Sequence, residues 1–154
     1  MDSIRTLVVG TTPDYIDDLR KKNPGKLFFL TDRQFRYRAH ENRPGSDEEL
    51  LCNLNEPEES RRSLLEYFHK NRLQADGIVC FDCEALPLSA LLARDLRLTY
   101  PSPEAIRNCR DKHLSKTLWH RFGVRCPHVR LFQSKKDVDG LSKTNCNTWV
   151  LKPS

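Results

Sequence analysis

Two lysines stand next to sequence features that favour the binding of an anion. Lys112 follows Asp111 at the predicted start of a helix, and Lys152 ends the apolar run 149–151. Backbone N–H groups at a helix start attract a phosphate, and a lysine beside them adds a full positive charge. An ammonium group in an apolar strand is costly unless an anion meets it. The pair therefore predicts a site for a phosphorylated ligand, against the alternative that each is an ordinary surface or chain-end lysine.

The first two thirds of the chain alternate predicted strands with predicted helices. Apolar runs bounded by turn residues predict short strands, at residues 7–10, 27–31, 49–52, 77–81 and 98–100. Helical spacing and helix-start residues predict three helices. They cover about residues 14–22, a segment that begins near residue 55 and extends beyond Phe68, and residues 88–96. Residues 32–45 are polar with no clear period, so we expect a loop there. The alternation predicts an α/β fold, a Rossmann-like parallel sheet with helices on both faces.

The pattern changes near residues 101–108, where we expect the first domain to end. Ser102 begins a predicted short helix, and Asp111 can cap a second helix that Gly123 ends. Two further strands are predicted, at residues 129–132 and 148–152. These elements predict a helical linker followed by the first strands of an α+β subdomain.

The two expected domains are residues 1–108 and 109–154. The apolar strand 148–152 would lack a neighbour on at least one side, and natural domains protect such edges. We therefore expect the chain to be the front part of a larger protein. The same unprotected strand is expected to promote self-association.

The basic character of the chain lies in its last third. Residues 1–106 hold 15 Lys/Arg against 18 Asp/Glu, whereas residues 107–154 hold 11 against 3. Such a segment attracts an anion, which could be a nucleotide, a nucleic acid or an acidic surface of the same protein. The segment Arg33–Arg38 interleaves aromatics with cations, as nucleic-acid binders do, but it stands in a region of balanced charge. A solvated loop or a subdomain contact is favoured there over nucleic-acid binding.

Composition argues against several other classes. No apolar run approaches the roughly 18 residues that a membrane span needs, and the first residues do not resemble a secretion signal. The six scattered cysteines are therefore expected to be reduced thiols in the cytoplasm. Cys80 and Cys83 form a single CxxC pair with no second pair at suitable spacing, so no metal site is predicted.

Familiar catalytic and nucleotide motifs are missing from the chain. The first strand ends in Gly10-Thr-Thr-Pro13, which has one glycine where a dinucleotide fingerprint needs three. A Walker loop and a defensible Ser/His/Asp arrangement are also missing. No catalytic residue is predicted.

The chain resembles the N-terminal portion of ATP-grasp enzymes, especially carboxylate–amine ligases of the amino-acid ligase and biotin carboxylase type. Those proteins begin with a Rossmann-like pre-ATP-grasp domain, which leads to a helical linker with a lysine, a G-V-x-x-P step and a strand ending in a lysine. The matching elements here are Ser102–Ala105, Asp111–Lys112, Gly123–Val124 with Pro127, and Val150–Pro153. Specific matches are confined to about residues 80–154, and the earlier residues match only in their general pattern of strands and helices.

The resemblance implies that residues 1–108 are the pre-ATP-grasp domain, and that 109–154 hold the linker and the truncated start of the ATP-grasp nucleotide-binding domain. It implies that Lys112 and Lys152 contact ATP phosphates. The parent protein would use ATP and magnesium to convert a carboxylic acid into an acyl phosphate, which an amine then attacks. The family's glycine-rich loop and magnesium ligands are expected beyond Ser154, so the fragment itself is expected to be inactive and to hold no cofactor tightly.

A different class of function remains open. The chain could be a non-enzymatic Rossmann-like module, complete as it stands, that binds a small ligand or a partner. A complete module would cover its last strand and enclose a pocket, whereas a fragment would leave that strand exposed.

Overall fold

The structure is a computed structural model that describes residues 3–10, 13–38, 44–134 and 136–137. The chain divides into two compact units, Met1–Ile106 and Arg107–Ser154. The predicted strand at 148–152, including Lys152, lies outside the described residues. No helix in the described ranges is both long enough and apolar enough to cross a membrane.

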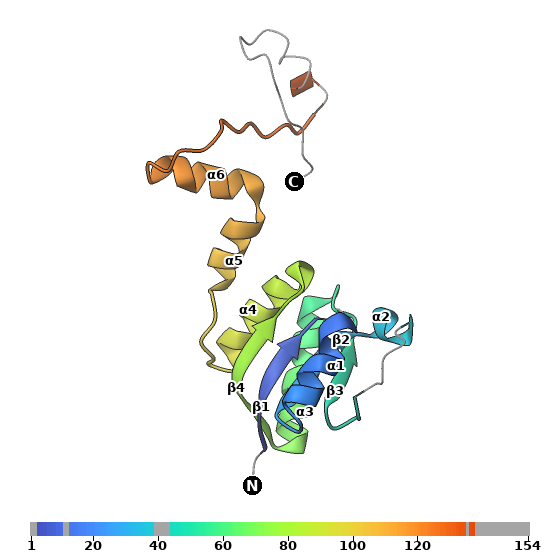
Figure 1. Cartoon of the computed structure of the whole chain (residues 1–154). Coiled ribbons are helices and arrows are strands. Elements are labelled where there is room, and N and C mark those ends of the chain that lie inside the picture. The colour runs from blue at the N-terminus through green and yellow to red at the C-terminus, as the bar shows by residue number, and fades with distance from the viewer. Residues whose placement is uncertain (1–2, 11–12, 39–43, 135, 138–154) are drawn as a thin grey trace. The chain divides into compact units, whose positions relative to one another are not determined.

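The first unit is built on a four-stranded parallel sheet (Figure 1). Its strands are β1 (Ser3–Val9), β2 (Leu27–Asp32), β3 (Glu49–Cys52) and β4 (Leu73–Cys80). They lie in the order β3-β2-β1-β4, and Val9 in β1 is aligned with Leu30 on one side and Cys80 on the other. The chain thus steps outward from β1 to β2 and β3, and then returns to the opposite side of β1. This confirms the parallel sheet that the strand–helix alternation predicted.

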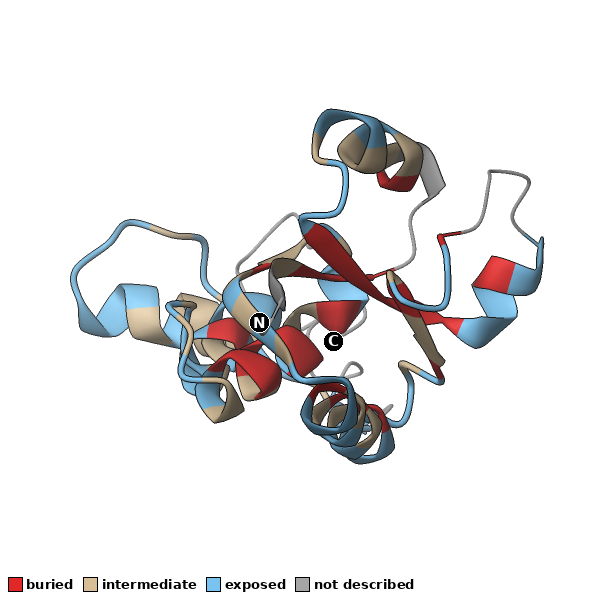
Figure 2. Cartoon of the chain, turned by 90° about the horizontal axis from the view of Figure 1, so that it is seen from below, coloured by how far each residue is buried: buried red, intermediate tan, exposed pale blue. Residues whose placement is uncertain are grey.

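Helices cover both faces of the sheet, because successive strand residues point to opposite faces. In β1, Val8 packs in the small cluster that includes Ile16 from α1 (Pro13–Lys22). Leu7 and Val9 face the other way, into the larger cluster. That cluster is completed by α3 (Pro57–Asn71), by the short 3₁₀ turn η1 (Cys83–Ala85) and by α4 (Leu86–Asp95). Figure 2 shows the buried residues concentrated along the strands and on the inward sides of these helices.

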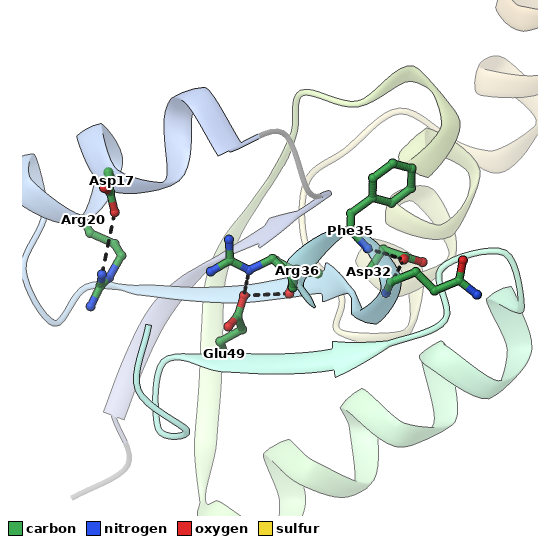
Figure 3. Close-up of polar contacts among 8 residues, drawn as sticks. Asp17, Arg20, Asp32, Phe35, Arg36 and Glu49 are labelled. Carbon is green, nitrogen blue, oxygen red and sulfur yellow. Dashed lines mark hydrogen bonds and ion pairs between the residues drawn. The ribbon is translucent and has the colours of Figure 1, made fainter. Parts of the chain in front are cut away.

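The segment expected to be a loop contains a helix, α2 (Arg33–Arg38), so that expectation was wrong. Hydrophobic periodicity did not predict this helix, because its one buried side chain is an arginine. Arg36 is 1% exposed, and its Nε donates a hydrogen bond to Glu49 Oε1 at 2.7 Å (Figure 3). The hydroxyl of Thr31 donates to the same oxygen at 2.7 Å. A buried charge is tolerated only when it is paired in this way.

Asp32, the last residue of β2, sets the path of the chain on both sides of α2. Its Oδ1 accepts hydrogen bonds from the backbone N–H groups of Gln34 and Phe35, which caps the start of α2 (Figure 3). Its Oδ2 accepts from the N–H of Leu54, in the turn after β3. One carboxylate therefore fixes the chain after two adjacent strands.

The predicted strand at 98–100 does not form. Leu98 and Tyr100 are half-buried against the larger core cluster, and the N–H of Leu98 donates to the carbonyl of Ala93 at 2.8 Å. The segment is thus held by the end of α4, and its apolar character reflects packing against the core. Sequence pattern alone cannot distinguish these two causes of burial.

After Pro101 the described part of the chain contains α5 (Pro103–Arg110) and α6 (Lys112–Arg121). Both were expected from their start signals, and Asp111 caps α6 as predicted. The predicted strand at 129–132 is wrong, because these residues adopt no regular structure. Helix α6 buries none of its side chains, and Phe122 directly after it is 74% exposed.

Candidate functional site

The strand order of the first unit points to one place for a ligand. In open parallel sheets, ligands bind outside the carboxyl ends of the strands, where the strand order reverses. Here the order reverses between β1 and β4. The residues that follow these two strands are Gly10 and the pair Phe81–Asp82. Together with Tyr15 of α1 they form what we call the switch-point cluster: Gly10, Tyr15, Phe81 and Asp82.

Gly10 allows the two strand ends to approach closely. Its φ of +121° is a conformation that residues with a side chain rarely adopt. A Cβ atom placed on it would lie 2.5 Å from Asp82 Oδ2 and 2.9 Å from the Tyr15 hydroxyl. The carboxylate therefore occupies the space where any other residue would carry its side chain. A glycine is required here because of both the backbone angle and the neighbouring carboxylate.

Two aromatic rings line the same cluster. The rings of Tyr15 and Phe81 are tilted against each other, with centroids 4.7 Å apart. The Tyr15 hydroxyl lies 3.5 Å from Asp82 Oδ1, and Asp82 is half-buried. Phe81 is 57% exposed although it is a large apolar residue. A partly buried carboxylate beside an exposed ring is a combination suited to binding a ligand with an apolar part and a hydrogen-bond donor.

Polar groups also lie around Cys80, which ends β4 two residues before Asp82. The Cys80 thiol donates a hydrogen bond to the carbonyl of Asp82, and burial raises its pKa, although the hydroxyl of Ser89 acts in the opposite direction. Burial also raises the pKa of Tyr100, whose ionised form the thiolate of Cys80 would disfavour further. Cys80 is therefore a thiol at neutral pH, and a thiolate for redox or metal chemistry is disfavoured.

Lys112, the first predicted site residue, is an exposed residue at the start of α6. The backbone donors beside it are already used, because Asp111 Oδ1 accepts hydrogen bonds from the N–H groups of His113 and Leu114, each at 2.8 Å. This capping carboxylate also places a negative charge at the helix start. These backbone donors are therefore less available to a phosphate than the sequence predicted, and Lys112 would act through its side-chain ammonium group.

The second predicted lysine cannot be placed, because Lys152 lies outside the described residues. Elsewhere in the second unit, the Lys116 ammonium group lies 4.3 Å from the centre of the Trp119 ring. An open groove of about 660 Å³ follows α6, lined by His120 and residues 123–127. Residues 123–127 are the G-V-x-x-P step that the sequence resemblance singled out.

Asp32 in the first unit occupies a position that matters in dinucleotide-binding folds. Asp32 stands at the end of the strand next to β1, where dinucleotide-binding folds carry an acidic residue for the ribose. Both of its oxygens accept backbone hydrogen bonds, from Gln34, Phe35 and Leu54. Asp32 is thus engaged in holding the chain. In the part of the chain that the structure describes, no group of three or more His, Cys, Asp or Glu is arranged to hold a metal ion.

Sequence reasoning missed the switch-point cluster, although two of its signals were present. A glycine ends the first apolar run, and an aspartate follows the fourth. These residues are about 70 positions apart, and only the strand order shows that they meet. The sequence pattern predicted which segments are strands but contained no information on which strand lies beside β1.

Comparison with known proteins finds a structural likeness to an enzyme. The crystal structure of an L-amino acid ligase from Bacillus licheniformis matches this chain with a TM-score of 0.65 and 20% sequence identity. The match covers 89% of this chain and 35% of the ligase, so the chain spans well under half of that protein's length. No protein-family model and no curated protein matches the chain. At this identity the likeness shows the fold, a mixed α/β arrangement around a parallel sheet that the ligase shares.

Proposed function

We propose that residues 1–154 are the N-terminal portion of an ATP-dependent carboxylate–amine ligase of the ATP-grasp type, acting on an amino acid or a peptide-like acid. The observation that carries this proposal is the structural likeness to an amino acid ligase over 89% of the chain. The likeness agrees with the sequence resemblance, which rests on different evidence, the residues around Lys112, Gly123 and Lys152. On this proposal, residues 1–108 form the pre-ATP-grasp domain and 109–154 begin the nucleotide-binding part.

The chemistry would proceed in two steps in the complete protein. A carboxylate oxygen of the acid attacks the γ-phosphorus of ATP, which forms an acyl phosphate and releases ADP. The amine then attacks the acyl carbon, and inorganic phosphate leaves as the amide bond forms. Lys112 and Lys152 would offset the negative charge of the ATP phosphates. Magnesium, which the family uses, would need acidic ligands other than those the described residues bring together.

This chain alone should bind ATP poorly. An exposed ion pair contributes only about 0–1 kcal/mol, whereas a millimolar dissociation constant already requires about 4 kcal/mol. Two lysines without an enclosing loop therefore predict a dissociation constant in the millimolar range or weaker, and no release of ADP.

The test uses a longer protein that extends past Ser154 in the same reading frame. Isothermal titration should show ATP binding at least tenfold tighter than for residues 1–154. In the longer protein, Lys112→Ala and Lys152→Ala should each weaken ATP binding about three- to tenfold. Lys116→Ala is the matched control, because Lys116 lies on the same helix but its ammonium group sits over Trp119. If the longer protein binds ATP normally with both lysines replaced, the assignment of these residues is wrong.

A second candidate function is a non-enzymatic module that binds a small ligand through the first unit. It is favoured by one observation, that all four members of the switch-point cluster lie within Met1–Ile106. On that account the longer protein would neither bind ATP tightly nor form ADP when candidate acids and amines are supplied. Measuring ADP release with a panel of amino acids separates the two functions.

A further inference from the structure

The switch-point cluster has features that the ATP reaction does not explain. We propose that it binds a primary ammonium group, such as the α-amino group of an amino acid, with Asp82 as the charged partner. The proposal rests on the proposed function for the statement that this ligand is a substrate of the enzyme. The binding itself follows from the geometry of the first unit.

The carboxylate of Asp82 lies where the two strand ends meet. Asp82 follows β4 directly, and its Oδ2 lies over Gly10, at the place where a side chain on that residue would begin. The carboxylate is half-buried, so a charge that approaches it is screened less than at an open surface. An ionised carboxylate has no hydrogen to donate and can only accept hydrogen bonds, whereas an ammonium group supplies three donors. Charge-assisted hydrogen bonds of this kind are about twice as strong as neutral ones.

A pair of aromatic rings lies in the same cluster as the carboxylate. Phe81 precedes Asp82 in the chain and remains 57% exposed, while Tyr15 packs against it with centroids 4.7 Å apart. A cation within about 6 Å of an aromatic face is attracted to it electrostatically. The same faces accept the apolar part of an amino acid. Carboxylate and rings together therefore match a small ligand that carries an ammonium group next to an apolar group.

The negative charge of Asp82 also limits the charge of a ligand that can bind there. A phosphate or carboxylate would be repelled by Asp82, which disfavours the use of this cluster as a nucleotide phosphate site. The strand end also lacks the successive glycines that let a backbone wrap a pyrophosphate. The cluster thus selects a positively charged group.

The test is an ATP-free titration of the 154-residue chain, followed by ¹H–¹⁵N NMR. The probe is L-alaninamide, which carries the ammonium group but no carboxylate, and N-acetyl-L-alaninamide is the matched probe without the charge. L-Alaninamide should shift the amide signals of Gly10 and Asp82, with a dissociation constant on the order of 1–100 mM. The acetylated probe should leave these signals in place at the same concentration and ionic strength.

Variants identify the groups responsible. Asp82→Asn should weaken binding of L-alaninamide about tenfold or more, because a charged partner is lost. Phe81→Leu should weaken it about two- to fivefold. Asp18→Asn is the control, because it removes an exposed carboxylate from the middle of α1. Equal binding by the parent chain and the Asp82→Asn variant, in a variant whose other signals are unchanged, would overturn the proposal. So would equal shifts with the acetylated probe.

Failure of this inference can be distinguished from failure of the proposed function. If the longer protein binds ATP and forms ADP but L-alaninamide does not shift Gly10 and Asp82, only the ammonium site is wrong. If the shifts occur and depend on Asp82 while the longer protein shows no ATP chemistry, the site stands and the ligase function is wrong.

Discussion

The buried ion pair between α2 and β3 supports a quantitative prediction about stability. Replacing Glu49 with Gln keeps the size of the side chain but removes the carboxylate charge that pairs with the buried guanidinium group of Arg36. The side chains of Arg36 and Glu49 are 1% and 5% exposed, and Nε and Oε1 are 2.7 Å apart. Thr31 donates to the same oxygen. The pair is thus almost completely removed from water and shares one acceptor with a third residue.

Removing one partner of a buried pair costs about 3–5 kcal/mol, because the remaining charge is left buried. Gln still accepts a hydrogen bond, so we expect Glu49→Gln to lower the free energy of unfolding by about 3 kcal/mol. With an m-value of about 2 kcal/mol per molar urea, the unfolding midpoint should fall by about 1.5 M. That is a large part of the 5–15 kcal/mol that holds a domain together.

The adjacent residue provides the control. Glu48 pairs with Arg20 at 2.9 Å, but the two side chains are 23% and 26% exposed. This half-buried pair is more accessible to water than the Arg36–Glu49 pair, and Arg20 also lies 3.9 Å from Asp17. Glu48→Gln should therefore move the midpoint by less than about 0.5 M. The double variant Arg36→Met with Glu49→Leu removes both charges and should recover most of the stability lost in Glu49→Gln.

Urea unfolding should be followed by far-UV circular dichroism. Both tryptophans, Trp119 and Trp149, lie in the second unit, so their fluorescence reports on that unit separately. The reasoning is refuted if Glu49→Gln and Glu48→Gln lower the midpoint equally, or if the double variant is less stable than Glu49→Gln alone. Equal effects would mean that the Arg36–Glu49 pair is hydrated in solution. A less stable double variant would mean that the apolar side chains do not compensate for the lost pair.

Three further outcomes are expected. Gly10→Ala should lower the free energy of unfolding in urea by about 2–4 kcal/mol, because Gly10 has a φ of +121° and the Asp82 carboxylate would lie 2.5 Å from the new Cβ atom. Gly25→Ala should lower it by about 1–2 kcal/mol, because Gly25 has a φ of +69° but open space around it. Arg72→Gly should raise the unfolding midpoint by the equivalent of about 0.5–1 kcal/mol, because Arg72 ends α3 in the left-handed conformation at φ 52°; an unchanged midpoint would show that this backbone is unstrained. With a maleimide at pH 7.5, the exposed thiols of Cys83 and Cys109 should react before the half-buried Cys80 and the buried Cys52, since burial also raises the pKa of the last two; faster labelling of Cys80 than of Cys83 would contradict this order.

The sequence by itself determined the elements that depend on neighbouring residues. The strand at 27–31 was predicted from its apolar run, because β2 lies between β1 and β3 and all of its residues are buried. The strand at 49–52 was predicted from a shorter apolar run, although β3 is at the edge of the sheet and is only partly buried. The start of α6 was predicted from Asp111, because a cap acts on N–H groups only two and three residues away. Information of this kind is local, and the chain needs no distant partner to express it.

Only the tertiary structure decided the features that join distant residues. Helix α2 is held by Arg36, which is polar in sequence and buried through Glu49, 13 residues later. The segment 98–100 is apolar because it packs on the core beside α4, and this packing cannot be separated from strand formation in the sequence. The switch-point cluster forms because β4 lies beside β1, which brings Asp82 over Gly10. Strand order results from the packing of helices on both faces of the sheet, and no short pattern of residues encodes it.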